Sequence, residues 1–140
     1  MINETVVVFG ASGFLGSHVA DALTAAGYRV RLFDRSPSPY LHSNQEMIIG
    51  DIMNLDQAIE AAKGASIVYN FAAIADIDEA HNKPIPTATI NVLGNMHALE
   101  AARIAGARRF VFASSVYVYS ESGSFYRASK QAAERFTETY

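Results

Sequence analysis

Five short apolar runs alternate with stretches of helical spacing along this chain, and this alternation constrains its fold more than any other feature. The first run, residues 5–9, is rich in β-branched residues and stops at Gly10, and the next stretch, 14–26, has apolar residues at helical spacing. Continuous apolar runs are typical of parallel strands that are buried on both faces. We therefore predict an α/β fold, a doubly wound parallel sheet with helices on both faces and strand order 3-2-1-4-5.

The expected strands cover residues 5–9, 29–33, 47–49, 66–73 and 109–114, and the expected helices cover 14–26, 55–63, 87–105 and the segment from Ser124 to the end, with a prolyl loop at 82–86. Ser124 is expected to cap the last helix through its hydroxyl. In such a sheet, ligands bind at the carboxyl ends of the strands, near the crevice between strands 1 and 4.

The composition favours a single domain and excludes several kinds of site. Half of the 140 residues are apolar, which is enough for one core, and the net charge is −3 with the basic residues scattered along the chain. No basic face is evident, so nucleic acid is not an expected partner. The lack of cysteine excludes disulfides and thiolate metal sites, and no other metal site is predicted. The longest charge-free apolar stretch, 64–75, is shorter than the roughly 20 residues of a spanning helix, so we expect a cytoplasmic protein without a membrane contact.

A glycine-rich turn, GASGFLG at residues 10–16, separates the first strand from the first helix. Gly10 allows a tight turn, Gly13 lets the backbone come close to a phosphate, and Gly16 lets helix and strand pack closely. The N-terminus of the helix then offers free N–H groups to a pyrophosphate. No Gly-Lys-Ser/Thr follows, which excludes a Walker loop. The turn predicts a Rossmann-type dinucleotide site, and a turn that merely needs small residues remains the alternative.

Acidic residues follow the second and third strands, where they can reach an adenosine. Asp34 ends the second strand, eighteen residues after Gly16, so its carboxylate is placed to accept hydrogen bonds from a ribose diol. A carboxylate there repels a 2′-phosphate, which favours NAD over NADP; Arg35 is either a partner for such a phosphate or a solvated loop residue. Asp51 either accepts from the adenine amino group, with Ile52 packing on the base, or caps the next helix.

A tyrosine and a lysine lie four residues apart in YRASK, on one face of the last predicted helix. Free tyrosine is a poor base at neutral pH, but a neighbouring ammonium favours the phenolate. We expect Tyr126 to exchange a proton with a substrate hydroxyl while a hydride passes to or from a nicotinamide. Lys130 would hold the ribose hydroxyls and tune the tyrosine, and Ser115, after the fifth strand, would hydrogen-bond the same substrate oxygen. For the Tyr-x-x-x-Lys pair by itself, an amphipathic surface helix is the alternative.

Several segments in this order resemble the extended short-chain dehydrogenases/reductases, and within them the NAD-dependent epimerase/dehydratase family that acts on nucleotide sugars. They are GASGFLG at 10–16, the Gly50-Asp51-Ile52 step, NFAA at 70–73, INVLGN at 90–95, SSVYVY at 114–119 and YRASK at 126–130. The resemblance covers essentially the whole chain. It implies a catalytic group of Ser115, Tyr126 and Lys130, a role for Asn91 in organising the site, and a position near the nicotinamide for Ser114. The residues expected to bind the cofactor are Gly10, Ser12, Gly13, Phe14, Leu15, Gly16, Asp34, Arg35, Asp51, Ile52, Phe71, Ala72, Ala73, Asn91, Ser114, Tyr126 and Lys130.

The sequence departs from this family in four ways. Asn70 stands where relatives often carry histidine, and only six residues separate Tyr119 from Tyr126, so the usual longer loop is nearly absent. Val116 and Tyr117 stand where dehydratases often carry an acid/base pair, which disfavours dehydration. Relatives are also about twice as long, so residues 1–140 are expected to be the NAD(P)-binding domain, with the substrate-binding C-terminal part absent.

The expected function is therefore that of an NAD-dependent epimerase/dehydratase-type oxidoreductase with a nucleotide-sugar substrate, although this chain alone would turn over little. The alternatives are a non-catalytic NAD-binding or scaffold protein and an inactive fragment of such an enzyme. The resemblance implies a homodimer formed through the two long C-terminal helices. Asp76, Asp78 and Glu79 form a carboxylate cluster after the fourth strand, either a solvated helix start or a substrate or metal site.

Overall fold

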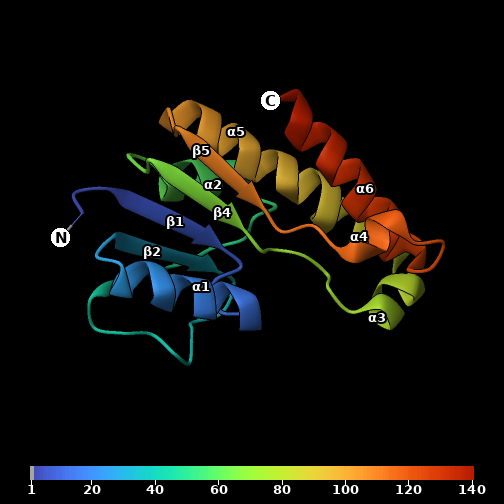
Figure 1. Ribbon diagram of the computed structural model, residues 1–140, viewed down its shortest axis with the longest axis horizontal. Helices are drawn as coiled ribbons and strands as arrows, with labels where there is room; N and C mark the ends of the chain where they lie inside the picture. Colours follow the sequence, from blue (N-terminus) through green and yellow to red (C-terminus); the bar gives the residue numbers. More distant parts are fainter. Residues whose placement is uncertain (1) are drawn as a thin grey trace.

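All strands run parallel to their neighbours in one sheet, as the computed structural model of the chain, which describes residues 2–140, shows (Figure 1). The strands are β1 (Thr5–Phe9), β2 (Arg29–Asp34), β3 (Gln45–Ile49), β4 (Ile67–Asn70) and β5 (Arg109–Phe112). Their order is β3-β2-β1-β4-β5, which confirms the predicted fold class and topology. The carboxyl ends of β1 and β4 consequently lie side by side, at the crevice where this architecture binds ligands.

Helices cover both faces of the sheet because successive strand residues point to opposite sides. Helix α1 (Phe14–Ala25) packs over Val8 and Leu32 on one face. On the other face, α2 (Leu55–Ala62) and α5 (Asn95–Ala105) cover Val7, Phe9 and Val68. The buried positions of α2 and α5 are mostly alanines, which lets both helices approach the sheet closely. Helix α6 (Ser124–Thr139) packs beside α5.

The segment between β4 and α5 differs from the prediction. A short helix, α4 (Pro84–Ala88), occupies most of the expected prolyl loop at 82–86, and another, α3 (Ile77–Asn82), precedes it. A π-helical segment, Thr89–Gly94, joins α4 to α5. Proline is tolerated in a first helical turn because the N–H it lacks would have no partner there, so the prolines begin α4 rather than prevent it. The expected helix from residue 87 therefore starts earlier and is wound more loosely in its middle.

Two strands are shorter than predicted because polar side chains take over their last backbone groups. The N–H of Ala72 donates to Asn70 Oδ1 (3.0 Å), and β4 ends at Asn70 after four residues. The carbonyl of Ala113, just after β5, accepts from Lys130 Nζ (2.7 Å). A 3₁₀ helix, Val116–Tyr119, lies beyond the expected end of the fifth strand, in the segment before α6.

The expected cap of the last helix is wrong. Gly123, with φ +105°, occupies the N-cap position of α6, and Ser124 is its first residue. The Ser124 hydroxyl instead lies 3.0 Å from His81 Nδ1 of α3. This contact fastens the start of α6 to α3. Within residues 2–140, the structure has no helix with the length and apolar character needed to cross a membrane.

Candidate cofactor and catalytic site

Gly10 and Gly16 are required by the packing of the protein itself. Gly10 has φ +74°, and a Cβ built on it would lie 2.5 Å from the backbone nitrogen of Ala72. A Cβ on Gly16 would lie 2.2 Å from the carbonyl oxygen of Gly10. These two glycines bring the turn after β1 against the segment after β4 and bring α1 down onto the turn, as the spacing predicted.

Gly13 differs, because the space beside it is open. A Cβ built on Gly13 would lie 3.4 Å from its nearest neighbour, the Gly10 carbonyl oxygen, which is an ordinary contact. Gly13 is also the N-cap of α1, and that helix has no side-chain cap among the residues that the structure describes. The first N–H groups of α1 are therefore available to an anion that approaches along Gly13. This local geometry fits a pyrophosphate.

Asp34 is held at the end of β2 by two backbone N–H groups. Its Oδ2 accepts from Ser12 N (3.0 Å) and its Oδ1 from Ser36 N (3.4 Å), and the Ser12 hydroxyl donates to the Ser36 carbonyl (2.6 Å). The carboxylate thus joins the glycine turn to the loop after β2. Each of its oxygens can accept further hydrogen bonds, so it remains suited to a ribose diol.

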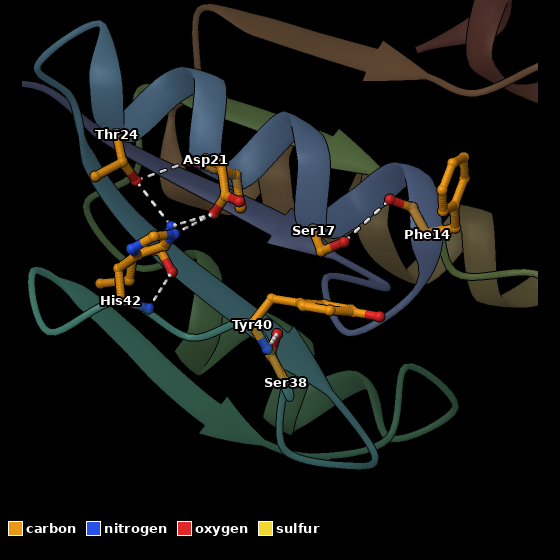
Figure 2. Close-up of polar contacts among 9 residues, drawn as sticks. Phe14, Ser17, Asp21, Thr24, Ser38, Tyr40 and His42 are labelled. Carbon is orange, nitrogen blue, oxygen red and sulfur yellow. Dashed lines mark hydrogen bonds and ion pairs between the residues drawn. The ribbon is translucent and has the colours of Figure 1, made fainter.

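The loop after β2 is fastened to α1 at its far end (Figure 2). His42 Nε2 lies 3.2 Å from Asp21 Oδ1, and Gln45 Nε2 donates to Asp21 Oδ1 (3.1 Å) and to Thr24 Oγ1 (3.0 Å). Between these anchors, the Tyr40 side chain lies beside α1 in Figure 2. The segment that carries Asp34 is therefore fixed at both ends beside the turn.

A cleft of about 220 Å³ lies at the carboxyl ends of the strands, as predicted. Nine of the expected cofactor residues line it: Gly10, Gly13, Asp34, Arg35, Asp51, Ile52, Phe71, Ala72 and Ala73. The prediction missed five others, Phe33, Gly50, Met53, Ile74 and Ile90. Gly50 and Met53 flank the predicted Asp51-Ile52 step, so their place in the cleft could have been predicted from that motif. Ile90 reaches the cleft from the π-helical segment, and no local sequence pattern indicated that segment.

Asp51 is not a helix cap. Its Oδ1 accepts from Met53 N (2.9 Å), and Asn54 caps α2 by accepting from Gln57 N (3.1 Å). The capping interpretation of Asp51 is therefore wrong, while its place in the cleft leaves it available to an adenine.

The side chain of Lys130 is buried at the end of β5, with 5% of its surface exposed. Its Nζ donates to the Ala113 carbonyl (2.7 Å) and lies 5.0 Å from the centre of the Phe112 ring and 5.8 Å from that of Tyr126. Burial lowers the pKa of Lys130 from its ordinary 10.5 to about 8. The ammonium is therefore present at neutral pH but is easily lost in mild alkali.

Ser115 and Tyr126 are linked through Tyr117. The Ser115 hydroxyl oxygen accepts from Tyr117 N (3.2 Å), and the rings of Tyr117 and Tyr126 meet edge to face with centres 6.3 Å apart. The three predicted catalytic residues thus gather around the carboxyl end of β5, beside the cleft rather than in its lining. Tyr117, at a position where dehydratases often carry one of their acid/base residues, is a neighbour of this group.

The other expected cofactor residues lie outside the lining of the cleft. The side chains of Phe14 and Leu15 are exposed on the first turn of α1, so these residues would contact a cofactor through their backbone N–H groups. The Ser114 hydroxyl donates to Glu134 of α6 (2.5 Å). Asn91 is buried in the π-helical segment, where its Oδ1 accepts from Ile74 N (2.7 Å) and its Nδ2 donates to Ser129 Oγ (2.9 Å).

The carboxylates after β4 belong to α3. Asp76 caps that helix by accepting from Glu79 N (2.7 Å), and Glu79 pairs with Lys83 (3.0 Å). Over residues 2–140, no group of three or more histidine, cysteine, aspartate or glutamate side chains is placed to hold a metal ion. The solvated helix start was the correct interpretation of these residues.

The sequence model of the NAD dependent epimerase/dehydratase family matches residues 6–140. UDP-glucose 4-epimerase of Rhizobium leguminosarum bv. trifolii is 34% identical over 124 residues, which are 85% of this chain and 38% of that enzyme. Ceramide reductase of Caulobacter vibrioides is 37% identical over 134 residues, which are 92% of this chain and 40% of that protein.

Among solved structures, that of MoeE5 in complex with UDP-glucose and NAD superposes with a TM-score of 0.87 at 31% identity, covering 96% of this chain and 48% of MoeE5. The chain therefore spans less than half of the length of each of these three relatives.

Proposed function

Because the chain belongs to the NAD dependent epimerase/dehydratase family, we propose that its cleft binds NAD and that Ser115, Tyr126 and Lys130 provide the acid–base chemistry for hydride transfer at a sugar carbon of a nucleotide sugar. One observation carries this proposal: a buried ammonium, Lys130, lies 5.8 Å from the ring of Tyr126 at the carboxyl end of β5. A buried lysine is unfavourable for stability, so its presence next to a phenol at the carboxyl edge of the sheet favours a chemical role.

The residues of the cleft fit NAD. Gly13 and the uncapped start of α1 would hold the pyrophosphate, and Asp34 would accept from the adenosine ribose. Asp51 and Ile52 line the same cleft and would meet the adenine. The carboxylate of Asp34 would repel the additional phosphate of NADP, which favours NAD. The family to which the chain belongs is itself NAD-dependent.

When bound, NAD accepts the hydride from the sugar carbon and can return it. Tyr126 would take the proton of the sugar hydroxyl as the carbonyl forms and give it back on reduction. The Ser115 hydroxyl would donate to the same sugar oxygen, since its oxygen already accepts from Tyr117 N. Lys130, with a pKa of about 8, would supply a positive charge that favours the phenolate at neutral pH.

A nucleotide sugar is the first candidate substrate because the UDP-glucose 4-epimerase relative and MoeE5, which was solved with UDP-glucose, act on or bind such molecules. An apolar alcohol or ketone is the second candidate. Val116, between Ser115 and Tyr117, is 81% exposed, and Tyr119, two residues after Tyr117, is 91% exposed. Phe125, beside Tyr126, is 44% exposed. These apolar side chains, together with the ceramide reductase relative, favour the second class.

Calorimetry with NAD and with NADP tests the cofactor, and we expect heat with NAD and weaker binding of NADP. The chemistry is tested by comparing the wild-type chain with Tyr126→Phe. With UDP-glucose, formation of the epimerised sugar nucleotide is measured as well as NADH fluorescence, because a hydride that returns to the sugar leaves no net NADH. With a long-chain secondary alcohol, NADH fluorescence is followed. We expect the substitution to remove turnover while leaving NAD affinity within about twofold. A Tyr126→Phe chain that is as active as wild type contradicts the catalytic assignment. No heat with either dinucleotide leaves only a scaffold protein or an inactive fragment.

Residues 1–140 would form the cofactor-binding part of such an enzyme, and two copies would pair through α5 and α6. Ile104 of α5 and Phe136 of α6 are large apolar side chains that are 50% and 40% exposed on these helices. Sedimentation equilibrium checks the pairing: a dimer that Ile104→Glu converts to a monomer supports it, and a wild-type monomer at high concentration contradicts it.

A further inference from the structure

Two asparagines form a buried hydrogen-bonded pair between β4 and α5. Asn70 and Asn95 are 2% and 1% exposed, and Asn70 Nδ2 donates to Asn95 Oδ1 (2.8 Å). Burying two amides is unfavourable unless their polar atoms find partners. Both side chains extend the contact in opposite directions, so the pair is the middle of a longer chain of hydrogen bonds.

One end of this chain of hydrogen bonds is at the cofactor cleft. Asn70 Oδ1 accepts from the N–H of Ala72 (3.0 Å), which lines the cleft. The same nitrogen is the atom that a Cβ on Gly10 would strike at 2.5 Å. Asn70 therefore holds the segment after β4 at the place where the glycine turn rests against it.

The other end is on α6. Asn95 Nδ2 donates to Thr137 Oγ1 (3.0 Å) and lies 3.4 Å from the Ala133 carbonyl, which also accepts from the Thr137 hydroxyl (2.8 Å). One turn before Asn95, Asn91 makes a parallel contact with Ser129 Oγ (2.9 Å).

The contacted positions on α6, 129, 133 and 137, are four residues apart and so lie on one side of the helix, over about 12 Å of its length. This side neighbours the one that carries Tyr126 and Lys130. Contacts at both ends of such a stripe fix the rotation of the helix about its axis.

The order of donors and acceptors along this series of hydrogen bonds is fixed by the groups at its two ends. A backbone N–H, that of Ala72, can only donate, so Asn70 must present its oxygen there and its NH₂ to Asn95. Asn95 must then accept with its oxygen and point its NH₂ at α6, where the Ala133 carbonyl can only accept. A single arrangement satisfies every group, which makes the network directional as well as buried.

We propose that Asn70 and Asn95 are positioning residues that hold α6, and with it Tyr126 and Lys130, in register with the cofactor cleft. An apolar pair of similar volume would fill the same space but would not fix how α6 is rotated about its axis. The consequence for catalysis rests on the proposed function, whereas the effect on the position of α6 does not.

The test compares Asn95→Leu with Gln45→Leu. Gln45 is also a buried amide that joins two elements, β3 and α1, but it lies at the opposite end of the sheet and does not contact α6. Both variants lose a buried network and are expected to lose similar stability in urea. Only Asn95→Leu should alter the surroundings of Lys130.

Lys130 itself provides the measurement, because the chain has three lysines and ¹³C-labelled lysine gives one Cε signal for each. Its titration midpoint should move up by about one pH unit in Asn95→Leu, since a displaced α6 returns water to the ammonium, and should stay put in Gln45→Leu. The affinity for NAD should fall about tenfold further in Asn95→Leu than in Gln45→Leu.

Equal Lys130 midpoints and equal NAD affinities in the two variants would overturn the proposal and leave the asparagines a purely structural role. If the wild-type chain does not bind NAD, the proposed function fails, and the Lys130 midpoint still decides the positioning role. If Asn95→Leu does not fold, Thr137→Val removes one contact of the same network and should raise the midpoint by a smaller amount; an unchanged midpoint then counts against the proposal.

Discussion

The burial of Lys130 predicts an unusual dependence of stability on pH. Its pKa is about 8 in the folded chain and 10.5 when exposed, because burial disfavours the ammonium. Between these two values, the unfolded chain holds a proton at this site that the folded chain has lost. Stability contributed by this group therefore rises with pH from about 8 to 10.5, the reverse of what a surface ion pair of lysine would give.

The size of this effect follows from the two pKa values. At pH 7 both states carry the proton, so stability hardly depends on pH through this site. At pH 9.5 the folded lysine is almost fully neutral, while the unfolded one is only about one-tenth neutral. Integration over this range gives a gain of about 2 kcal/mol for the wild-type chain. Lys130→Met has no such site and should show none of this gain.

Urea denaturation of the wild-type and Lys130→Met chains gives the free energy of unfolding of each at pH 7 and pH 9.5. The gain is the change in the wild type between these pH values minus the change in Lys130→Met. The pKa of Tyr140 is raised first by burial and then by Glu100, but this residue is present in both chains and its contribution cancels. Lys63→Met, at a lysine whose side chain is 77% exposed, is the matched control and should follow the wild type. If wild type and Lys130→Met change in parallel between the two pH values, the ammonium is not buried as the structure has it.

Three further predictions concern the cofactor cleft. Gly10→Ala should destabilise the chain by about 3 kcal/mol or more in thermal or urea denaturation, because it adds a methyl in a left-handed conformation against the Ala72 backbone; a change below about 1 kcal/mol would refute this packing. Gly13→Ala should change stability by less than about 1 kcal/mol and yet weaken NAD binding in calorimetry, since its methyl enters the open approach to α1; unchanged affinity would count against a pyrophosphate there. Asp34→Asn should bring the affinities for NADP and NAD closer together by about tenfold, as the repulsion of a 2′-phosphate is removed, and an unaltered ratio would remove Asp34 from cofactor selection.

The sheet and its order could be predicted from the sequence because the responsible signals are local. Runs such as Thr5–Phe9 are apolar throughout, and Gly27, Gly64 and Gly106 take positive φ just after α1, α2 and α5. Parallel strands joined by helices admit few topologies, so the order β3-β2-β1-β4-β5 followed from the alternation. The cleft residues that follow directly on strands, such as Asp34 and Asp51, were predictable for the same reason.

The parts that the sequence did not predict depend on contacts between distant segments. The π-helical segment brings Ile90 to the cleft, but its apolar spacing is that of an ordinary helix. The early end of β4 depends on a side-chain acceptor, Asn70, whose amide orientation is in turn set by Asn95, 25 residues later. No short window of sequence contains both partners.

The glycine-rich turn illustrates how a correct prediction can rest on mixed causes. Of its three glycines, Gly10 and Gly16 are explained by backbone packing within the chain, and a protein with this fold would need them even if it bound nothing. Gly13 alone has no such explanation, since a side chain there would meet only ordinary contact. The motif therefore indicates the fold first and the ligand second. The specific case for a dinucleotide rests on Gly13, on the carboxylate of Asp34 at the rim of the cleft, and on the buried charge of Lys130 next to Tyr126. These residues come from three separate segments of the chain and all lie at the carboxyl edge of the sheet.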